Sequence, residues 1–208
     1  MHWADFAAQT LSHRGDKHII ASGITPSGEF HIGHLREILT GDMVTKACLN
    51  AGMDAEFVFI VDSADPLRKV YPFLSDEYEK YIGCALATIP APDEDGKPGN
   101  DGRNYAQHFL EPFLAALEQI DVRPRIIDNY TSYANGEFAL RSKIACEKAT
   151  EIREIIERVS GRELAPSWFP FNPYGHNGSL DGVTVTGFEW PYVHWEQDGI
   201  PGKSDLNK

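Results

Sequence analysis

The feature that most constrains this chain is a strand-like run followed by a tight turn and a helix-like segment that opens with two histidines. Residues 17–23 form a short β-branched run ending in glycine, which predicts a buried strand. A Thr-Pro-Ser-Gly turn follows at residues 25–28. Apolar residues then recur every three or four positions until an Ala-Gly pair at residues 51–52, which predicts an amphipathic helix with a glycine stop. Strand, turn and helix in this order predict the first half of a βαβ unit.

The tetrad His-Ile-Gly-His at residues 31–34 stands where this helix is expected to begin. A helix N-terminus presents unpaired backbone N–H groups and the positive end of the helix dipole, so anions bind there. His31 and His34 are three residues apart and share a helix face, and both are expected to donate hydrogen bonds to phosphoryl oxygens. Gly33 lets adenine or phosphate approach the backbone without meeting a Cβ. The four letters are unspecific alone, but the preceding strand and turn supply the context that a phosphate site requires.

A second predicted strand, residues 55–62, ends in an acid. Ligands of doubly wound sheets sit at the carboxyl edge of the strands, so Asp62 is a candidate substrate-binding residue. Asp62 and Asp65 are candidates to orient a cationic substrate group or to position Arg68. A turn and helix start is the alternative interpretation of the Asp65-Pro66 pair.

Later segments predict further elements and one insertion. Residues 88–103, rich in Pro, Gly and Asp, predict a mobile surface loop within an insertion. A helix that Pro112 kinks or breaks is expected next, over residues 105–120. The remaining predictions are a strand at residues 125–128, one long helix at 136–160 stopped by Gly161, strands at 182–188 and 192–195, and a tail containing residues 202–204. That tail fails as a Walker A loop because Gln197 stands where the first glycine is needed.

Residues 22–42, SGITPSGEFHIGHLREILTGD, resemble the HIGH-motif region of class I lysyl-tRNA synthetases, the Rossmann-type lysine enzymes rather than the class II ones. Further similar blocks follow in order along nearly the whole chain, at residues 61–72, 78–81, 108–114, 159–164 and 171–173. The resemblance implies an α/β fold: an incomplete Rossmann-type (HUP-like) parallel sheet with an inserted helical segment and a small C-terminal β lobe. We expect residues 1–165 to form the first half of the catalytic core and residues 166–208 to form the lobe.

The resemblance also implies a function, which is ATP-dependent activation of lysine and transfer of the lysyl group to tRNA(Lys). The implied roles are steadying of the phosphates for His31 and His34, and room for adenosine at Gly33. By this resemblance, Pro26, Ser27 and Gly28 shape the turn that binds ATP. Gly23 and Thr25 are implied to face the amino acid. Mg²⁺ is expected to arrive with ATP, because magnesium keeps water and phosphate ligands.

The chain departs from the family pattern in two places. The family usually has a zinc ribbon with paired cysteines after the Phe-Asn-Pro block, whereas residues 174–176 are Tyr-Gly-His and no cysteine follows Cys146. With only His176 and His194 available, a tetrahedral site lacks its thiolates, so we predict a zinc-free lobe with no metal ligands. We expect it to be held by the aromatic side chains of Trp168, Phe169, Phe171, Phe188, Trp190 and Trp195.

The second departure is the missing Lys-rich KMSKS loop, together with the helical anticodon-binding region that follows it in the family. We therefore expect a fragment or truncated form that supplies the HIGH half of an active site and is inactive alone.

Composition bears on partners and compartment. The net charge is −12 and no quarter of the chain has an excess of Lys and Arg, so most of the tRNA surface is expected outside this chain. The best basic cluster consists of Arg123, Arg125, Arg141, Lys143 and Lys148. Cys48, Cys84 and Cys146 are expected to be buried free thiols. No uninterrupted apolar stretch approaches eighteen residues and no signal-like N-terminus is present, which predicts a cytoplasmic protein without a membrane partner.

Two other functions stay open. A small HxGH nucleotidylyltransferase would share the strand, turn and tetrad and would suit the length of 208 residues, but has no counterpart to the blocks after Asp62. A non-catalytic, truncated paralogue would bind nucleotide or a partner without turnover. The sequence makes no prediction of the oligomeric state.

Overall fold

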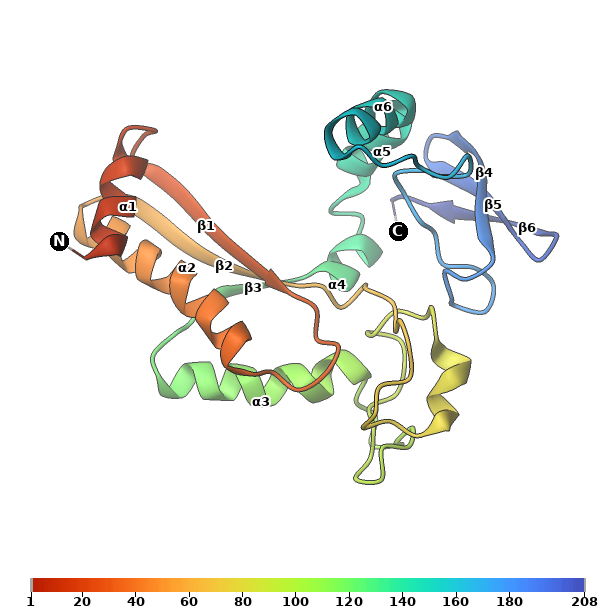
Figure 1. The fold of residues 1–208 in the computed structure, drawn as a ribbon, viewed down its shortest axis with the longest axis horizontal. Helices are drawn as coiled ribbons and strands as arrows, with labels where there is room; N and C mark the ends of the chain where they lie inside the picture. Colours follow the sequence, from red (N-terminus) through yellow and green to blue (C-terminus); the bar gives the residue numbers. More distant parts are fainter. Residues whose placement is uncertain (1, 208) are drawn as a thin grey trace. The chain divides into compact units, whose positions relative to one another are not determined.

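The computed structural model describes residues 2–207, which form two compact units, each described here by itself (Figure 1). Unit 1 comprises the chain up to Asp65 together with Leu86–Asn129, and unit 2 comprises Pro66–Ala85 together with the chain from Tyr130 onward. These units differ from the two predicted domains, 1–165 and 166–208, whose boundary stays a prediction.

Unit 1 is built on a three-stranded parallel sheet in the order β1-β2-β3. The strands are β1 (Lys17–Ile24), β2 (Asp54–Val61) and β3 (Arg125–Asp128). All three were predicted, with ends that differ by at most one residue. The helices α2 (Ile32–Asn50) and α3 (Tyr105–Gln119) follow the tetrad and the loop as predicted. A parallel sheet with these helices confirms the Rossmann-like α/β class.

The core of unit 1 lies between one face of the sheet and these two helices. Phe57, Phe59 and Val61 alternate along β2, so their side chains point to the same face, as the period of a strand requires. Ile38 of α2 and Phe113 of α3 pack against them in the same buried cluster. The sequence analysis missed the first helix, α1 (Trp3–Ser12), which buries two alanines against the end of α2.

Helix α3 runs through Pro112 as one continuous helix, so the predicted break is wrong. A proline removes one intrahelical hydrogen bond, which favours a break in an isolated peptide. Here Phe109 lies before the proline, Phe113 and Leu117 lie after it, and all three are buried. Because packing supplies most of a helix's stability in a protein, burial on both sides of Pro112 keeps the two halves in one helix.

Unit 2 contains a small antiparallel sheet in the order β4-β5-β6 (Figure 1). Its strands are β4 (Val183–Glu189), β5 (Tyr192–Gln197) and β6 (Ile200–Asp205). The first two were predicted, whereas β6 replaces the predicted tail. The unit also contains the 3-10 helix η1 (Asp76–Tyr81), the helix α5 (Ala139–Glu147) and the helix α6 (Ala149–Ser160), and α4 (Asn129–Ala134) begins at the last residue of unit 1.

The aromatic residues predicted to hold the lobe are largely in its core. Cys146, Val193 and Leu206 form a buried cluster, on which Phe169, Phe171, Phe188 and Trp190 pack. Trp195 is also buried, on β5. Trp168 is outside this cluster.

The predicted long helix at residues 136–160 is two helices, because Lys148 leaves helical geometry with φ −105° and ψ 20°. Cys146, near the end of α5, lies in the core of unit 2, whereas Val159, near the end of α6, is 77% exposed. Gly161 ends α6 with φ +67°, a left-handed conformation that glycine adopts without steric cost, so the predicted stop is confirmed.

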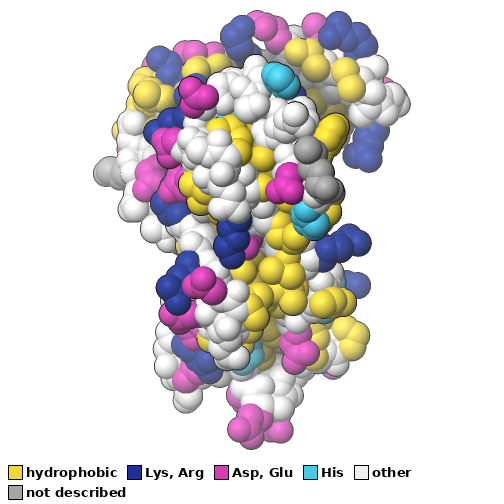
Figure 2. Space-filling view, turned by 90° about the vertical axis from the view of Figure 1, so that its left-hand side faces the viewer, with side chains coloured by type: hydrophobic (Ala, Val, Ile, Leu, Met, Phe, Trp, Pro, Cys, Tyr) yellow, Lys and Arg dark blue, Asp and Glu magenta, His cyan; other side chains and the backbone are white. Residues whose placement is uncertain are grey.

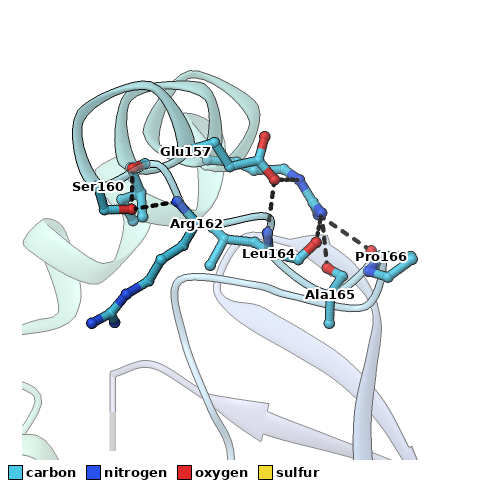
Figure 3. Close-up of polar contacts among 8 residues, drawn as sticks. Glu157, Ser160, Arg162, Leu164, Ala165 and Pro166 are labelled. Atoms are coloured by element: carbon cyan, nitrogen blue, oxygen red, sulfur yellow. Dashed lines mark hydrogen bonds and ion pairs between the residues drawn. The ribbon is translucent and has the colours of Figure 1, made fainter.

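The segment after α6 is tied back onto the helix (Figure 3). The guanidinium of Arg153 donates to the carbonyl oxygens of Leu164 at 2.5 Å and Ala165 at 2.9 Å, and reaches that of Pro166 at 3.4 Å. Glu157 accepts a hydrogen bond from the Leu164 N–H at 3.0 Å and pairs with Arg153 at 3.3 Å. This arrangement fixes the chain around residue 165 to α6.

Two smaller predictions concern thiols and membranes. Cys48, Cys84 and Cys146 are buried and form no disulfide, as predicted. Between residues 2 and 207, no helix combines the length and the apolar character needed to cross a membrane.

Candidate functional site

The polar residues of unit 1 gather where its three parallel strands end. The last residues of β1, β2 and β3 lie side by side, since Ile24 pairs with Val61 and Val61 pairs with Asp128. Whatever follows each strand is therefore brought to one edge of the sheet, which is where open α/β sheets bind ligands. Thr25 follows β1, Asp62 follows β2 and Asn129 follows β3.

Asp62 is held in place by Asn129, the residue that follows the neighbouring strand β3. The Asn129 side-chain amide donates from Nδ2 to Asp62 Oδ1 at 2.8 Å, and its Oδ1 accepts from the Ala64 N–H at 2.9 Å. Burial raises the pKa of the Asp62 carboxyl above its usual range, and the like charge of Asp65 raises this pKa further. A carboxylate in this environment gains from a cationic ligand, because a positive charge would favour its ionised form.

Gly23 lies beside Asp62, and both are predicted substrate-binding residues. A Cβ built on Gly23 would lie 3.8 Å from Asp62 Oδ2. Thr25, the third predicted residue, donates from Oγ1 to Asp65 Oδ2 at 2.8 Å. The three residues are therefore at one edge of the sheet, and Thr25 contacts Asp65 rather than Asp62.

The two histidines cap the N-terminus of α2 reciprocally. His31 is the N-cap residue and its Nδ1 accepts from the Gly33 N–H at 3.0 Å, while His34 Nδ1 accepts from the His31 N–H at 3.0 Å. This arrangement corrects one expectation, since the imidazoles occupy backbone N–H groups that were expected to meet an anion. Because Nδ1 accepts in both rings, we assign each neutral ring its proton at Nε2. The donors that these residues can present to a phosphate are then two Nε2–H groups.

The two rings are close together, with His31 exposed and His34 partly buried. Their centroids are 3.9 Å apart, and Phe30 lies 5.0 Å from His34. Burial lowers the pKa of His34 below its usual range, and the neighbouring His31 lowers this pKa further. The lowered pKa of His34 favours its neutral ring, whose Nδ1 accepts from the His31 N–H. A Cβ on Gly33 would be 2.8 Å from His31 Cε1, so the missing side chain makes room for the His31 ring.

The turn before the tetrad is held by its own hydrogen bond and by one from α3. Pro26 is fully buried, and the Ser27 N–H donates to the Thr25 carbonyl at 2.8 Å. The Ser27 carbonyl accepts from the Tyr105 hydroxyl at 2.8 Å. Gly28 is half-buried and completes the turn. The predicted ATP-binding residues of the turn are thus contiguous and anchored to α3.

Four of the five residues in the basic cluster proposed for nucleic acid form ion pairs with carboxylates. Arg123 pairs with Asp121 at 3.5 Å and Arg125 with Glu56 at 2.6 Å. Within unit 2, Lys143 pairs with Glu147 at 3.7 Å and Lys148 with Glu151 at 2.9 Å. Figure 2 shows Lys and Arg interspersed with Asp and Glu on the visible face. In the described part of the chain, no three His, Cys, Asp or Glu side chains are grouped so that they could hold a metal ion.

Sequence reasoning missed three residues of this site. Asn129 holds Asp62, the Asp128 carboxylate accepts from the Ser63 hydroxyl at 2.5 Å, and Tyr105 anchors the turn. Asp128 ends the third strand and Asn129 follows it, at the same edge of the sheet as Asp62, so the rule that selected Asp62 would also have selected them. Tyr105 carries no such signal, because its partner is a backbone carbonyl 78 residues earlier.

Comparison with known proteins places the chain in a family. A family model described as "tRNA synthetases class I (K)" matches residues 1–208. The chain is 41% identical to a lysine–tRNA ligase of Archaeoglobus fulgidus over 95% of its own length, and 39% identical to one of Picrophilus torridus over 99%. It spans 39% of each of these two curated relatives. Over its whole length, the chain belongs to the class I tRNA synthetases of the K type.

Proposed function

We propose that the protein carrying this chain is a lysine–tRNA ligase, and that the chain supplies the part that holds ATP and the amino group of lysine. The observation that carries the proposal is that the chain connects the predicted substrate-binding residues at the end of β1 directly to the two histidines at the start of α2. Gly23, the residue before the last of β1, lies beside Asp62, and the chain then reaches the His31 and His34 caps of α2. The relatives with which the chain shares about 40% identity are named as lysine–tRNA ligases, which supports the choice of lysine.

The proposed reaction has two steps. The lysine carboxylate attacks the α-phosphorus of ATP, giving lysyl-adenylate and releasing pyrophosphate, and the lysyl group then passes to the 3′ end of tRNA(Lys). The protein acts mainly by positioning reactants and stabilising charge. His31 and His34 would donate from Nε2 to the phosphate oxygens, Gly33 would leave room for adenosine, and Asp62 would bind an ammonium group of lysine. Mg²⁺ would accompany the triphosphate.

The edge of the parallel sheet at β1 supports the proposal that this chain provides one half of the active site. Among the described strands, β1 lies at the edge and pairs with β2 alone. Ile19 of β1 is 63% exposed, on the face opposite the core. Parallel sheets are normally covered on both faces, so an edge strand with an exposed isoleucine is suited to receive further structure. We propose that the chain is inactive in aminoacylation without that structure.

The charge distribution supports the proposal that tRNA is bound mostly by regions outside this chain. A protein that binds a polyanion needs Lys and Arg side chains available to phosphates. Four of the five predicted basic residues are paired with carboxylates, and the net charge is −12. The location proposed for such an enzyme is the cytoplasm.

The proposal is tested in two measurements. Calorimetry on the chain itself should show ATP binding that weakens in His31→Ala and His34→Ala. In the full protein that carries this chain, lysine-dependent exchange between ATP and pyrophosphate should fall at least about a hundredfold in either variant, because loss of one donor to developing charge costs about 3 kcal/mol. Unchanged exchange would contradict the assignment of the two histidines.

Two other outcomes would replace the proposal. Adenylate transfer from ATP to a phosphorylated acceptor, with no exchange driven by lysine, would identify a nucleotidylyltransferase. ATP binding by the full protein without any exchange would identify a non-catalytic relative. Testing other amino acids in the same exchange assay measures the specificity for lysine.

A further inference from the structure

Helix α3 contacts the segment that carries the histidines at two places. Tyr105, in its first turn, is fully buried and donates its hydroxyl to the Ser27 carbonyl at 2.8 Å. Phe113, two turns further along the helix, stacks on Phe30 with ring centroids 4.3 Å apart and an interplanar angle of 14°. The two contacts lie on either side of Gly28 and Glu29. The segment between β1 and α2 is therefore supported by one rigid element at both of its ends.

The second contact continues to the histidines. Phe30 lies against His34 with ring centroids 5.0 Å apart, and His34 lies 3.9 Å from His31. Phe113, Phe30, His34 and His31 thus form a continuous row of rings that leads from α3 to the N-cap of α2. Any shift of the turn relative to α3 would move the first ring that His34 touches.

The hydroxyl of Tyr105 is itself a fixed point. Asn104 caps α3, accepting from the Gln107 N–H at 2.8 Å, so the first turn of the helix is well defined. The Tyr105 N–H donates to the Ile89 carbonyl at 2.9 Å, which ties the residue to the preceding loop. The Tyr105 ring packs on Phe109, with centroids 4.9 Å apart. Because these contacts fix the Tyr105 side chain, its hydroxyl restricts the position of the Ser27 carbonyl.

From these contacts we infer that Tyr105 is a positioning residue for the nucleotide. It holds the Ser27 carbonyl, and through the turn it sets the direction in which His31 and His34 present their Nε2–H groups, without touching the nucleotide. The inference rests on the proposed function, because it assigns Tyr105 to the ATP side of that site. Its chemistry is a single neutral hydrogen bond, and a phenylalanine would keep the ring and remove the bond.

The test compares Tyr105→Phe with Tyr78→Phe in the full chain. Tyr78 is equally buried, but it belongs to unit 2, so its variant controls for the loss of a buried hydroxyl as such. Two readouts are measured, the Kd for ATP by calorimetry and the imidazole ¹⁵N resonances of His31 and His34 by NMR. We expect Tyr105→Phe to raise the Kd about threefold to tenfold and to shift the His31 and His34 resonances. Tyr78→Phe should change neither.

The two readouts separate the positioning role from the proposed function. If the wild type binds ATP and Tyr105→Phe binds it equally well with unshifted histidine resonances, the positioning role is wrong while the ATP site stands. If the wild type does not bind ATP, the proposed function fails, and the histidine resonances still decide whether Tyr105 positions the pair. Should Tyr105→Phe not fold, Phe30→Leu probes the other contact, and unshifted His34 resonances there would likewise overturn the inference.

Discussion

At the scale of single residues, the site depends on an atom that is missing. His31 reaches the Gly33 N–H only because Gly33 has no Cβ, which would otherwise lie 2.8 Å from His31 Cε1. We therefore predict that Gly33→Ala displaces the His31 ring and removes its cap on α2. Losing a side-chain cap costs about 1 kcal/mol, so the free energy of unfolding in urea should fall by that amount.

The matched control for this prediction is Gly187→Ala. Gly187 lies in β4, and a Cβ added there meets no atom within 4 Å. Its free energy of unfolding should change by less than that of Gly33→Ala. Equal losses in the two variants would show that the effect of Gly33→Ala comes from backbone freedom and not from the displaced ring.

His34 makes stability depend on pH near neutrality. Burial and then His31 lower the pKa of His34 in the folded state, whereas an unfolded histidine titrates near about 6.5. As pH falls, His34 therefore takes up its proton in the unfolded state before it does so in the folded state. The stabilisation from neutral His34 is complete above the pKa of the unfolded state, and it is lost as pH falls through the lower pKa of the folded state. Protonation would also remove the Nδ1 acceptor of the cap.

We predict a lower urea midpoint at pH 5.5 than at pH 7.5, and a smaller difference in His34→Gln. Part of the difference should remain in that variant, because burial, followed by Arg103, also lowers the pKa of His108. His34→Gln with an unreduced difference would contradict the role of His34 in the pH dependence.

Patterns of residues predicted the types of the site residues better than their contacts. The tetrad indicated the N-terminus of a helix and Asp62 indicated the edge of a sheet, and both are where they were expected. A sequence pattern does not show which polar atoms of a side chain bond to the backbone and which are available to a ligand. His31 and His34 each use Nδ1 on the helix itself, and Asn129 uses both ends of its amide within the protein. Such uses follow from distances that exist only after folding.

At the scale of elements, the end of α6 depends on one guanidinium. Arg153 directs its N–H groups toward the carbonyl oxygens of Leu164, Ala165 and Pro166, the three residues labelled at the end of the segment in Figure 3. A lysine has one ammonium group at the end of a flexible chain and does not reproduce this fork. We predict that Arg153→Lys lowers the free energy of unfolding by about 1–2 kcal/mol, measured by urea titration.

Arg158→Lys is the control for this prediction, because Arg158 lies in the last turn of the same helix and has the same propensity for it. Its stability should stay within about 0.5 kcal/mol of the wild type. If Arg153→Lys is equally mild, the hydrogen bonds to residues 164–166 do not stabilise the folded chain.

Elements were predicted well where apolar residues followed one period and poorly where tertiary packing overrode local preference. The strands of the parallel sheet are runs of β-branched and aromatic residues, and all three were found. In contrast, β6 contains Pro201 and Gly202, which strands usually avoid. Gly202 is nevertheless required there, because a Cβ would lie 2.4 Å from the Trp195 ring on β5. The pairing of β6 with β5 stabilises this strand, so the residues of β6 alone do not predict it.

At the scale of the whole molecule, the order of elements determined the fold class. A strand, a helix and a second strand in sequence imply a right-handed crossover and a parallel sheet, and the sheet is parallel throughout. The small C-terminal β lobe was implied by the family resemblance, and it contains an antiparallel sheet. The division into compact units was not accessible in this way, because residues 66–85 join the C-terminal part of the chain.

In the lobe, the buried side chain of Gln197 is hydrogen-bonded to the loop of residues 177–181. Its amide donates to Asn177 Oδ1 at 2.9 Å and to the Asp181 carbonyl at 2.8 Å, and Gln197 is 4% exposed. Asn177 Oδ1 also accepts from the Ser179 N–H at 2.9 Å. One side chain of β5 therefore fixes the whole loop from residue 177 to residue 181. A metal held by this loop and sheet would perform the same task.

We predict that the lobe folds without zinc, so an excess of chelator should leave the thermal midpoint of the chain unchanged. Gln197→Ala is the positive control, since it truncates a buried side chain and removes its hydrogen bonds to Asn177 Oδ1 and the Asp181 carbonyl, and it should lower the midpoint by several degrees. Stoichiometric zinc in the purified chain, together with a midpoint that falls on chelation, would contradict the prediction. If instead Gln197→Ala lowers the midpoint and chelation does not, hydrogen bonds replace the metal in holding this loop on β5.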